Sequence, residues 1–575
     1  MFKNVHYNTV TSKIHLWEQY NGEDVYTVIP WAPHLYIKTD KSDIHTIDGI
    51  PVERVNFDKY KTYFNHQKNN PNVFENKCIP VIQFLGEQYS GVPDDDIEVP
   101  KLLVYYIDIE IEYEKSKGFP EPMKAESPIN LISIRNSKTG RTITFGEKPY
   151  TGKSNIIYKH CPTEKKLMSE FFKYMYKHPP DVISGWNVYD FDMQYIINRC
   201  GNIFDKRKNM YKLMSPIKMV KTWVDKLGND KIDIAGITIL DYMEIYKWYT
   251  PNNLESYSLD FVSNFELQKG KLDYSEYKDL ENLAKEDWNM YVDYNVIDCK
   301  HVHQIGKKSG YIKLIQALSL LTKVPMKYYS AMTQLIEGAM ITYYRRNNLC
   351  APYFAGGTQK KFPAAFVKDP KKGMHKWITS VDITSSYPSH IITLNMSIET
   401  FIGRIMDMTE EQILRHVRDH DFPHGNLSDK KLKPQVFNEM VRRKLVSVAP
   451  CGSVFTNHKK GTIATVVRNI FFKRIAVKKQ MQELKSKVSK MRGDEKKMTK
   501  EKIAQLFDYQ LAIKIVINAV YGILAVPYSR YFNPDIAEAV TSCGRHTIKQ
   551  GEVFINDLLN DPNEELKNIL EEIDG

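Results

Sequence analysis

The stretch Leu102-Leu-Val-Tyr-Tyr-Ile-Asp-Ile-Glu-Ile111 places two acids in an otherwise apolar run. Side chains of a strand alternate between its two faces, so Asp108 and Glu110 share one face while the isoleucines share the other. Two adjacent carboxylates on a buried strand repel each other, and a divalent cation removes that repulsion. A solvated edge strand gives the same pattern, so the rest of the chain has to decide between these two interpretations.

Two later stretches add acids at the ends of predicted elements. Asp192 follows a short apolar strand with a glycine turn and precedes a helical run over 193–199. Tyr294 and Asp298 lie four residues apart in a predicted helix near 287–300, which puts them on one face, as in an ordinary surface pair. As a set, the four acids can hold two Mg²⁺ ions about 4 Å apart that activate a water, which Tyr294 would hold. These acids are Asp108, Glu110, Asp192 and Asp298.

The composition is that of a large protein, and its net charge is compatible with a polyanionic partner. A chain of 575 residues is too long to fold around a single hydrophobic core, so we expect several domains. A content of 42% hydrophobic and 12% aromatic residues excludes a wholly disordered protein. Seven scattered cysteines without a CxxC pair are typical of free thiols in a reducing compartment. We find no signal peptide and no run of about 18 apolar residues, so we expect a soluble, cytoplasmic protein without a membrane segment. The formal net charge of +11 suits a polyanion.

A further acid lies in residues 380–389, Ser-Val-Asp-Ile-Thr-Ser-Ser-Tyr-Pro-Ser. The residues that lead up to Asp382 are apolar or β-branched: Trp377, Ile378 and Val381. A polar turn then ends at Tyr387-Pro388, so the pattern predicts a buried strand that delivers a carboxylate to its end. Such an acid is costly to bury unless a metal or another cation meets it, although an ordinary turn aspartate has the same pattern.

Positive charge is concentrated between Lys459 and Lys502, where fifteen Lys and Arg residues stand against four acids. This excess of eleven positive charges equals the net charge of the whole chain, so we expect this region to contact a polyanion. Part of the charge would lie on the solvated tip of a helical hairpin. Arg474 and Lys478 are spaced four residues apart near the start of this region, so they can share a helix face and reach one phosphate group.

The helix predicted at about 500–524 has an apolar packing stripe and a neighbouring polar stripe. The polar stripe carries Lys514, Asn518 and Tyr521, followed by Gly522. A cation, an amide and an aromatic ring one turn apart suit a triphosphate, a sugar or base edge and the surface of a base pair. The polar flank of any amphipathic helix is the alternative.

Together these stretches resemble family B DNA polymerases, most closely the replicative polymerases of T4-like bacteriophages. The first four acids and Tyr294 resemble the exonuclease motifs of the DEDDy 3′→5′ proofreading exonucleases, in which the acids bind metal. Residues 382–389 resemble polymerase motif A, and residues 514–522 resemble motif B. The resemblance implies that Asp382 and the backbone carbonyl of Ile383 bind metal and that Tyr387 stacks under the incoming sugar. It also implies triphosphate contacts from Arg474, Lys478 and Lys514, and a border of the nascent base pair formed by Asn518, Tyr521 and Gly522.

The implied fold is a multidomain α/β protein. A β-rich N-terminal domain would comprise 1–101 and 311–352, and a DEDDy exonuclease domain with an RNase H-like fold would comprise 102–310. An incomplete palm would comprise 353–440 and 527–575, and helical-hairpin fingers 441–526. A β-hairpin over 218–234 would correspond to the strand-separating hairpin of the family.

One family motif, a tyrosine-glycine-aspartate-threonine-aspartate turn, does not occur between Tyr521 and Gly575, where the last acids, over 561–574, predict a solvated helix. Our leading hypothesis is therefore the N-terminal subunit of a split, DNA-templated DNA polymerase with proofreading exonuclease. A second polypeptide would supply the missing acid, the thumb and contact with any sliding clamp. Expected ligands are primer-template DNA, single-stranded DNA, dNTPs and Mg²⁺ or Mn²⁺. A free-standing exonuclease and a non-catalytic nucleic-acid-binding protein are the alternatives.

Overall fold

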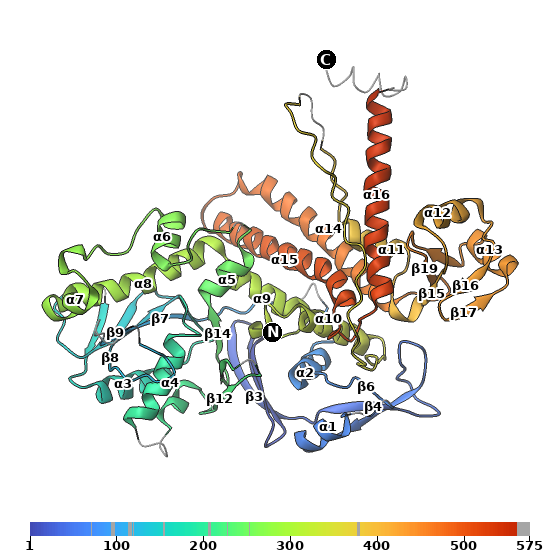
Figure 1. Cartoon of the computed structure of the whole chain (residues 1–575). Coiled ribbons are helices and arrows are strands. Elements are labelled where there is room, and N and C mark those ends of the chain that lie inside the picture. The colour runs from blue at the N-terminus through green and yellow to red at the C-terminus, as the bar shows by residue number, and fades with distance from the viewer. Residues whose placement is uncertain are drawn as a thin grey trace.

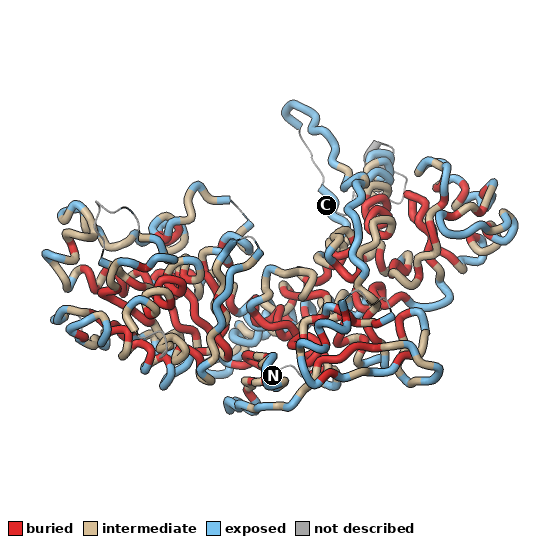
Figure 2. Tube along the Cα trace, turned by 60° about the horizontal axis from the view of Figure 1, so that its bottom comes forward, coloured by how far each residue is buried: buried red, intermediate tan, exposed pale blue. Residues whose placement is uncertain are grey.

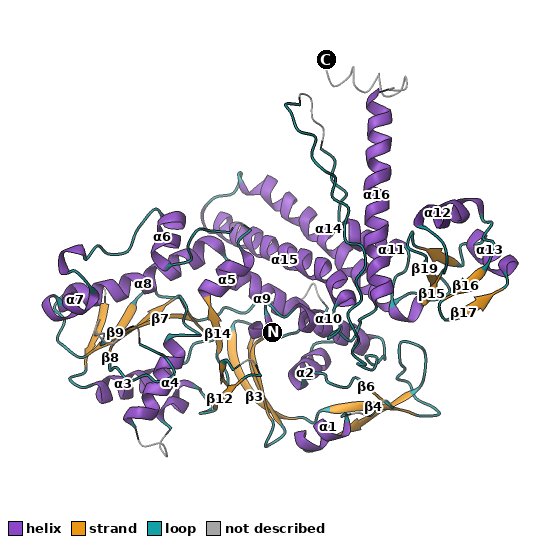
Figure 3. Cartoon of the chain, in the orientation of Figure 1, coloured by secondary structure: helices purple, strands orange, loops and turns teal. Residues whose placement is uncertain are grey.

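A computed structural model describes the chain except residues 69, 71, 94–97, 113–117, 119, 153–155, 205–208, 227, 252, 376–379 and 561–575. Trp377, Ile378 and the terminal acids of 561–574 therefore lie outside the described residues. Figure 1 shows a large sheet with its helices at one end, a helical hairpin across the middle and a small α/β unit at the other end. The mixed α/β, multidomain prediction is confirmed, and Figure 3 shows strands on both sides of the helical middle.

The N-terminal region contains two small antiparallel sheets. The first joins β1 (Phe2–Asn8), β2 (Lys13–Tyr20) and β3 (Glu23–Pro30) in that order. The second has the order β5–β4–β6 and includes two short helices: β4 (His34–Lys38), β5 (Val52–Asn56), α1 (Tyr60–His66), β6 (Val73–Phe74) and α2 (Pro80–Gln88). Buried side chains of β1, β2 and α2 share one core with α9 (Tyr311–Thr322) and α10 (Met332–Arg346). This shared core supports our proposal that 1–101 and 311–352 form one domain.

The next region is built on a six-stranded mixed sheet of order β10–β9–β8–β7–β11–β14. Its strands are β7 (Val104–Ile111), β8 (Ile129–Asn136), β9 (Thr142–Gly146), β10 (Ile156–His160), β11 (Val182–Gly185) and β14 (Thr238–Asp241). The predicted acid-bearing strand is β7, and it lies inside the sheet between β8 and β11. The alternative of a solvated edge strand is therefore wrong.

Helices cover both faces of this sheet. They are α3 (Glu164–Lys177), α4 (Asp192–Ile203), α5 (Tyr242–Tyr249), α6 (Leu259–Leu267), α7 (Leu280–Glu286) and α8 (Trp288–Ser309). Ile107 and Ile109 pack in the core that contains the buried side chains of α3 and α4, as the alternation predicts. The helices predicted over 193–199 and 287–300 are found within α4 and α8. The predicted hairpin over 218–234 is confirmed as β12 (Val220–Val224) paired with β13 (Asp230–Ile234), with Leu227 outside the described residues.

A small α/β unit follows motif A. It contains β15 (Phe401–Arg404), α12 (Glu410–Asp419), β16 (Gly425–Leu427), β17 (Lys430–Leu432), α13 (Pro434–Arg442), β18 (Val446–Val448) and β19 (Ser453–Thr456). Because β18 and β19 pair with each other and β19 pairs with β15, residues 441–461 belong with this unit. The helical hairpin, which we expected from residue 441, begins at Thr462 and consists of α14 (Thr462–Val488) and α15 (Gly493–Ala525). The predicted helix at 500–524 is the second part of α15.

Residues 353–375 and 380–385, here called the arm, have no helix or strand. The arm extends beside α16 (Pro534–Asn560) in Figure 1 and is largely exposed in Figure 2. The prediction of a buried strand ending at Asp382 is therefore wrong: Asp382 is exposed, and Val381 is 63% exposed. A strand needs a neighbour for its backbone hydrogen bonds, and no described strand pairs with this segment. The turn at Thr384-Ser385 does form, and α11 (Ser386–Thr393) follows it.

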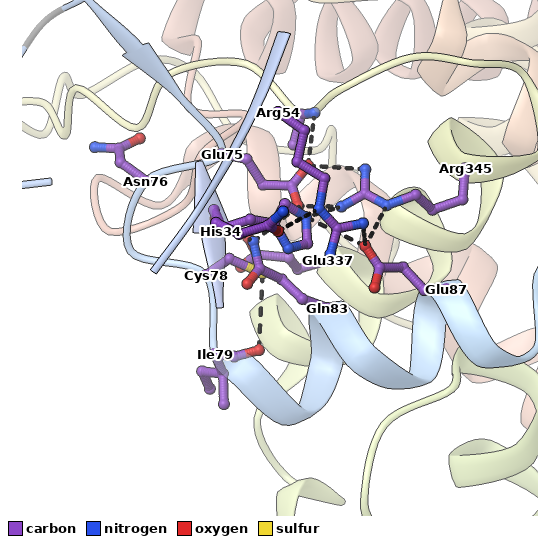
Figure 4. A network of polar contacts seen from close by, with 12 residues as sticks. His34, Arg54, Glu75, Asn76, Cys78, Ile79, Gln83, Glu87, Glu337 and Arg345 are labelled. Carbon is purple, nitrogen blue, oxygen red and sulfur yellow. Dashed lines mark hydrogen bonds and ion pairs between the residues drawn. The ribbon is translucent and has the colours of Figure 1, made fainter. Parts of the chain in front are cut away.

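A network of buried charges joins the N-terminal region to α10 (Figure 4). Glu75 is completely buried and forms an ion pair with Arg345, and the amide of Gln83 donates to it at 2.9 Å. Glu87 lies 2.9 Å from Arg54 and 3.5 Å from Arg345. These pairs hold the second N-terminal sheet, α2 and α10 together.

Helix α15 is, among the described residues, the one helix long and apolar enough to cross a bilayer by length and composition. This corrects our expectation that no such stretch exists. Its apolar character has a packing explanation, because Ile513, Ile517 and Val520 lie in the core shared with α9, α10 and α14.

Candidate active site

The four predicted exonuclease acids line one cleft of about 850 Å³, here called the acidic cleft. Asp108 and Glu110 come from β7, Asp192 from the first turn of α4, and Asp298 from the middle of α8. Tyr294, one turn before Asp298, lines the same cleft. The structure therefore brings together all five residues that the sequence singled out.

A tight turn carries Asp192 to the cleft. A side chain at Gly185 would lie 2.5 Å from the carbonyl oxygen of Ile107, so only glycine allows β11 to approach β7 this closely. The carboxylate of Asp241 then accepts hydrogen bonds from the backbone amides of Asn187 at 3.2 Å and Tyr189 at 2.9 Å. The close approach at Gly185 and the hydrogen bonds to Asp241 fix the turn after β11, so α4 begins at the cleft.

Two polar side chains, Asn295 and Lys271, organise the acids. The amide of Asn295 donates to Asp108 Oδ2 at 2.5 Å and to Glu110 Oε1 at 3.4 Å. Lys271 Nζ donates to the hydroxyl of Tyr294 at 2.9 Å and to Asp298 Oδ2 at 2.5 Å. Asp298 Oδ1 is buried without a hydrogen-bond partner among the described residues. One oxygen of Asp298 thus meets a cation while the other remains available.

Burial and mutual repulsion raise the pKa of each acid. Burial raises the pKa of Asp108 well above its usual range, and Asp192 and Glu110 raise it further. The pKa of Glu110 rises to about 8 through burial and the charge of Asp298. Burial also raises the pKa of Asp192 and of Asp298, although Lys271 opposes the shift at Asp298. The cleft therefore has too few cations of its own to compensate four ionised carboxylates.

Lys271 and Tyr294 both keep their protons in this environment. Burial lowers the pKa of Lys271, but Asp298 and Tyr294 outweigh it and raise the pKa above the ordinary value. Burial and Asp298 raise the pKa of the Tyr294 hydroxyl. The site therefore presents a protonated amine and a protonated phenol beside four carboxyl groups.

The acidic cleft fits divalent cations by its donor chemistry, because oxygen ligands with surplus negative charge are what Mg²⁺ and Mn²⁺ prefer. Among the described residues, no group of three Asp, Glu, His or Cys side chains has the arrangement of a metal site. The ammonium group of Lys271 instead forms an ion pair with Asp298, one of the proposed ligands.

Two of the predicted nucleotide-binding residues, Tyr387 and Tyr521, meet at the base of the helical hairpin. The ring of Tyr387, at the start of α11, lies 4.9 Å from the ring of Tyr521 on α15. A side chain at Gly544 of α16 would come within 2.9 Å of Tyr387, so α16 closes on this ring. Motifs A and B are thus adjacent through their tyrosines.

The charged members of this second set are more open. Lys478, Lys514 and Asn518 are exposed, and Gly522 is half-buried. Arg474 is half-buried, and its Nε atom has no hydrogen-bond partner among the described residues. Asp382 and Ile383 lie in the exposed arm, and the expected metal-binding carboxylate does not line the acidic cleft.

Sequence reasoning missed Lys271, Asn295 and Asp241. Lys271 lies in an irregular polar segment where no spacing or periodicity marks it. Asn295 could have been found, because an amide among the apolar residues of a predicted helix is unusual in a sequence. In the structure its side chain is fully buried in α8. Asp241 is the N-cap of α5, a pattern that capping rules recognise.

Comparison with known proteins agrees with this arrangement. The family model for DNA polymerase family B matches residues 323–572, and the model for its exonuclease domain matches residues 53–262. The chain is 26% identical to the DNA-directed DNA polymerase of Escherichia phage RB69, over 84% of this chain and 57% of that protein. It is 28% identical to the DNA-directed DNA polymerase of Enterobacteria phage T4, over 79% of this chain and 55% of that protein. The DNA polymerase delta catalytic subunit of Dictyostelium discoideum is 27% identical over 82% of this chain and 40% of its own length.

The chain spans about half the length of the curated relatives it matches. Its N-terminal β-rich region, exonuclease domain and partial polymerase domain follow the order in which the two family models match. The chain belongs to the family B DNA polymerases and contains their exonuclease domain.

Proposed function

We propose that the acidic cleft removes nucleotides from the 3′ end of single-stranded DNA, as a 3′→5′ exonuclease. The observation that carries this proposal is the convergence of four acids with raised pKa values from β7, α4 and α8, beside a tyrosine held by Lys271. Such a cluster of acids costs folding free energy when it ionises, and it suits cations that bind together with a phosphodiester.

The proposed metal ligands are Asp108, Glu110, Asp192 and Asp298. When bound, Mg²⁺ or Mn²⁺ would activate a water and stabilise the leaving oxygen of the phosphodiester. Asn295 orients Asp108 and Glu110, and the backbone amide of Ile109 donates to Asp192 Oδ1 at 3.0 Å. Because Lys271 donates to its oxygen, the Tyr294 hydroxyl is free to donate its own proton to the attacking water and so to orient it.

The test is Mg²⁺-dependent digestion of 5′-labelled single-stranded DNA by the parent chain and by Asp108→Ala. We expect the variant to lose digestion, whereas Glu112→Ala, an exposed acid at the rim of the same cleft, should retain it. Digestion by Asp108→Ala at the parent rate would show that the assignment is wrong.

We further propose that the base of the helical hairpin binds an incoming dNTP for DNA-templated nucleotidyl transfer to a primer. Asp382 and the carbonyl of Ile383 would hold metal, and Tyr387 would lie under the sugar. The triphosphate would meet Arg474, Lys478 and Lys514, and the nascent pair would border Asn518, Tyr521 and Gly522. The adjacency of Tyr387 and Tyr521 and the unpartnered Nε of Arg474 support this proposal. These ligands suit a cytoplasmic replication protein.

We also propose that a second polypeptide completes the nucleotidyl-transfer site and covers the arm and α16. Support comes from the exposure of Asp382 and from the large apolar side chains exposed on these two segments: Val367, Met374, Val381, Ile548, Val553 and Phe554. An apolar surface of this kind marks a contact with another polypeptide. The partner would carry the second acid, the thumb and any contact with a sliding clamp.

Primer extension with the chain alone and with a candidate partner tests this proposal. We expect extension only with the partner, and we expect Val553→Asp with Phe554→Asp to block it without slowing digestion. Val10→Asp, at a 91% exposed residue of the N-terminal region, is the control. Brisk extension by the chain alone would contradict the need for a partner. If no partner restores extension, the free-standing exonuclease, favoured by the complete acidic cleft, is the better description.

A further inference from the structure

A second and larger cleft, of about 1410 Å³, lies between the exonuclease domain and the end of the helical hairpin; we call it the basic cleft. It shares no lining residue with the acidic cleft. One wall is formed by the start of β7, the end of α8 and the start of α9. The other wall is the first four turns of α15, which packs on α9 (Figure 1).

Lysines line both walls. The exonuclease wall contributes Lys101, Lys138, Lys307 and Lys313. The hairpin wall contributes Lys496, Lys497, Lys500 and Lys502. Three acids, Glu98, Glu501 and Asp508, also line the cleft, and none of the eight lysines forms an ion pair with a described residue. With eight lysines against three acids, the cleft holds a net positive charge, although the charge of Lys313 is partly offset by Asp508.

The two clefts lie at different positions along the same two elements, β7 and α8. On β7, Val104 and Tyr106 line the basic cleft, whereas Asp108 and Glu110 line the acidic cleft. On α8, Tyr294 and Asp298 line the acidic cleft and Lys307 lines the basic cleft. A ligand in the basic cleft would thus be held beside the exonuclease site without entering it.

We infer that the basic cleft binds single-stranded DNA through its phosphate backbone. This inference rests on the proposed function for the nature of the polynucleotide, and the cleft is otherwise independent of the acidic site. Lysines act as point charges without the planar fork by which arginine recognises one group, so eight lysines with no arginine suit a run of phosphates read without sequence preference.

Size and arrangement favour a chain of phosphates over a small anion. The cleft exceeds the range of roughly 300–1,000 Å³ typical of small-molecule pockets. Lining residues recur every four positions from Lys496 through Lys500 and Ala504 to Asp508, so the lined face of α15 extends about 18 Å along the helix. A single phosphate would meet one wall, whereas a polynucleotide can contact both and bridge the hairpin to the exonuclease domain.

The test is binding of a fluorescent dT20 to the full chain in EDTA, which prevents digestion, measured by anisotropy across a salt series. The variant replaces one lysine of the exonuclease wall and two of the hairpin wall: Lys307→Gln, Lys496→Gln and Lys500→Gln. The control removes equal charge from exposed lysines of the same hairpin outside the cleft: Lys485→Gln, Lys487→Gln and Lys490→Gln.

We expect the cleft variant to bind dT20 at least tenfold more weakly at 50 mM salt, and the control to stay within twofold of the parent. The slope of log K against log salt should fall by about 2 in the cleft variant, because three phosphate contacts are lost. Restoration of binding by arginine at the same three positions would confirm that charge, and not altered folding, is responsible.

Equal losses in the two variants would overturn the inference, because surface charge in general would then explain binding. Displacement of dT20 by poly-glutamate at equal charge would overturn the assignment to a polynucleotide, and equal binding of a 20-base-pair duplex would overturn the single-stranded assignment.

Digestion of a labelled trinucleotide, too short to bridge the clefts, should be unchanged in the cleft variant. If the parent digests nothing while the binding differences hold, the exonuclease proposal alone fails.

Discussion

Two glutamates that carry buried charge have opposite pKa shifts. Glu75 is completely buried in the N-terminal region, and although burial alone would raise its pKa, Arg345 and His34 lower it to about 2 (Figure 4). Glu110 lines the acidic cleft, where burial and Asp298 raise its pKa to about 8. The difference lies in what surrounds each carboxyl group: the guanidinium of Arg345 and neutral hydrogen-bond donors in one case, and three further acids in the other.

This contrast separates a structural charge from a functional one. The network around Glu75 gives the carboxylate partners within the protein, so ionisation stabilises the folded state. The acidic cleft leaves its carboxylates short of partners, so their ionisation costs folding free energy until a cation binds. A site that holds unneutralised charge is prepared for a ligand from outside the chain.

The largest expected effect is that of Glu110→Gln, which separates stability from activity. We expect digestion of single-stranded DNA to fall about a thousandfold, or roughly 4 kcal/mol, because a metal ligand is lost. The Tm at pH 8.5 without metal should rise, because repulsion within the cleft is relieved. Glu112→Gln, at an exposed rim residue, should change neither quantity, and a fall in the Tm of Glu110→Gln would contradict the comparison.

The matching change in the N-terminal charge network, Glu75→Gln, should lower stability and leave digestion unchanged. Because it removes the nearest ion-pair partner of the buried Arg345 and leaves only Glu87, we expect a loss of about 3 kcal/mol in the free energy of unfolding, measured in urea at pH 7. Digestion at 20 °C should be unchanged. The stabilisation from Glu75 should be complete above about pH 4.5 and disappear as the pH falls toward 2, since its folded-state pKa is lowered.

The exposed Glu53 in β5 provides the control for that change. Glu53→Gln should alter the free energy of unfolding by less than about 0.5 kcal/mol. An equal loss in both variants would show that the network of Figure 4 adds nothing beyond surface charge.

Replacing Lys271, the cation that contacts Asp298 in the acidic cleft, tests how the charge of the cleft is balanced. We expect Lys271→Met to slow digestion about a hundredfold, because the Tyr294 hydroxyl and Asp298 lose their hydrogen-bond donor. Lys269→Met, two residues earlier and exposed, should digest at the parent rate. Equal rates for the two variants would remove Lys271 from the mechanism.

The smallest effect concerns pH and metal together. Since the pKa of Glu110 is about 8, protons compete with Mg²⁺ below that pH, and metal affinity should rise as the pH increases from 6 to 9. We expect Mg²⁺ to raise the Tm by about 2 °C more at pH 9 than at pH 6. In Glu110→Gln the pH dependence of this Tm shift should diminish. A larger Mg²⁺-induced Tm shift at pH 6 than at pH 9 would contradict the assignment of Glu110 as a metal ligand.

The sequence predicted much of the fold and of the exonuclease site. The alternation in β7 and the four-residue spacing in α8 are local patterns, and the structure retains both. The sequence did not predict Lys271, because its role depends on Asp298, which is distant in the chain and comes near only after folding. It also predicted a strand up to Asp382, where the described chain offers no pairing partner. A strand depends on its neighbours, whereas a helix satisfies its own backbone.

The sequence by itself determined which residues carry the chemistry, because acids, tyrosines and lysines at fixed spacings keep their identity and their face on an element. Only the tertiary structure decided how their charges are balanced. Lys271 against Asp298, Arg345 against Glu75 and the unpaired lysines of the basic cleft all depend on distances between remote segments. Electrostatic energy depends on separation and burial in space, and neither quantity is encoded in local sequence spacing.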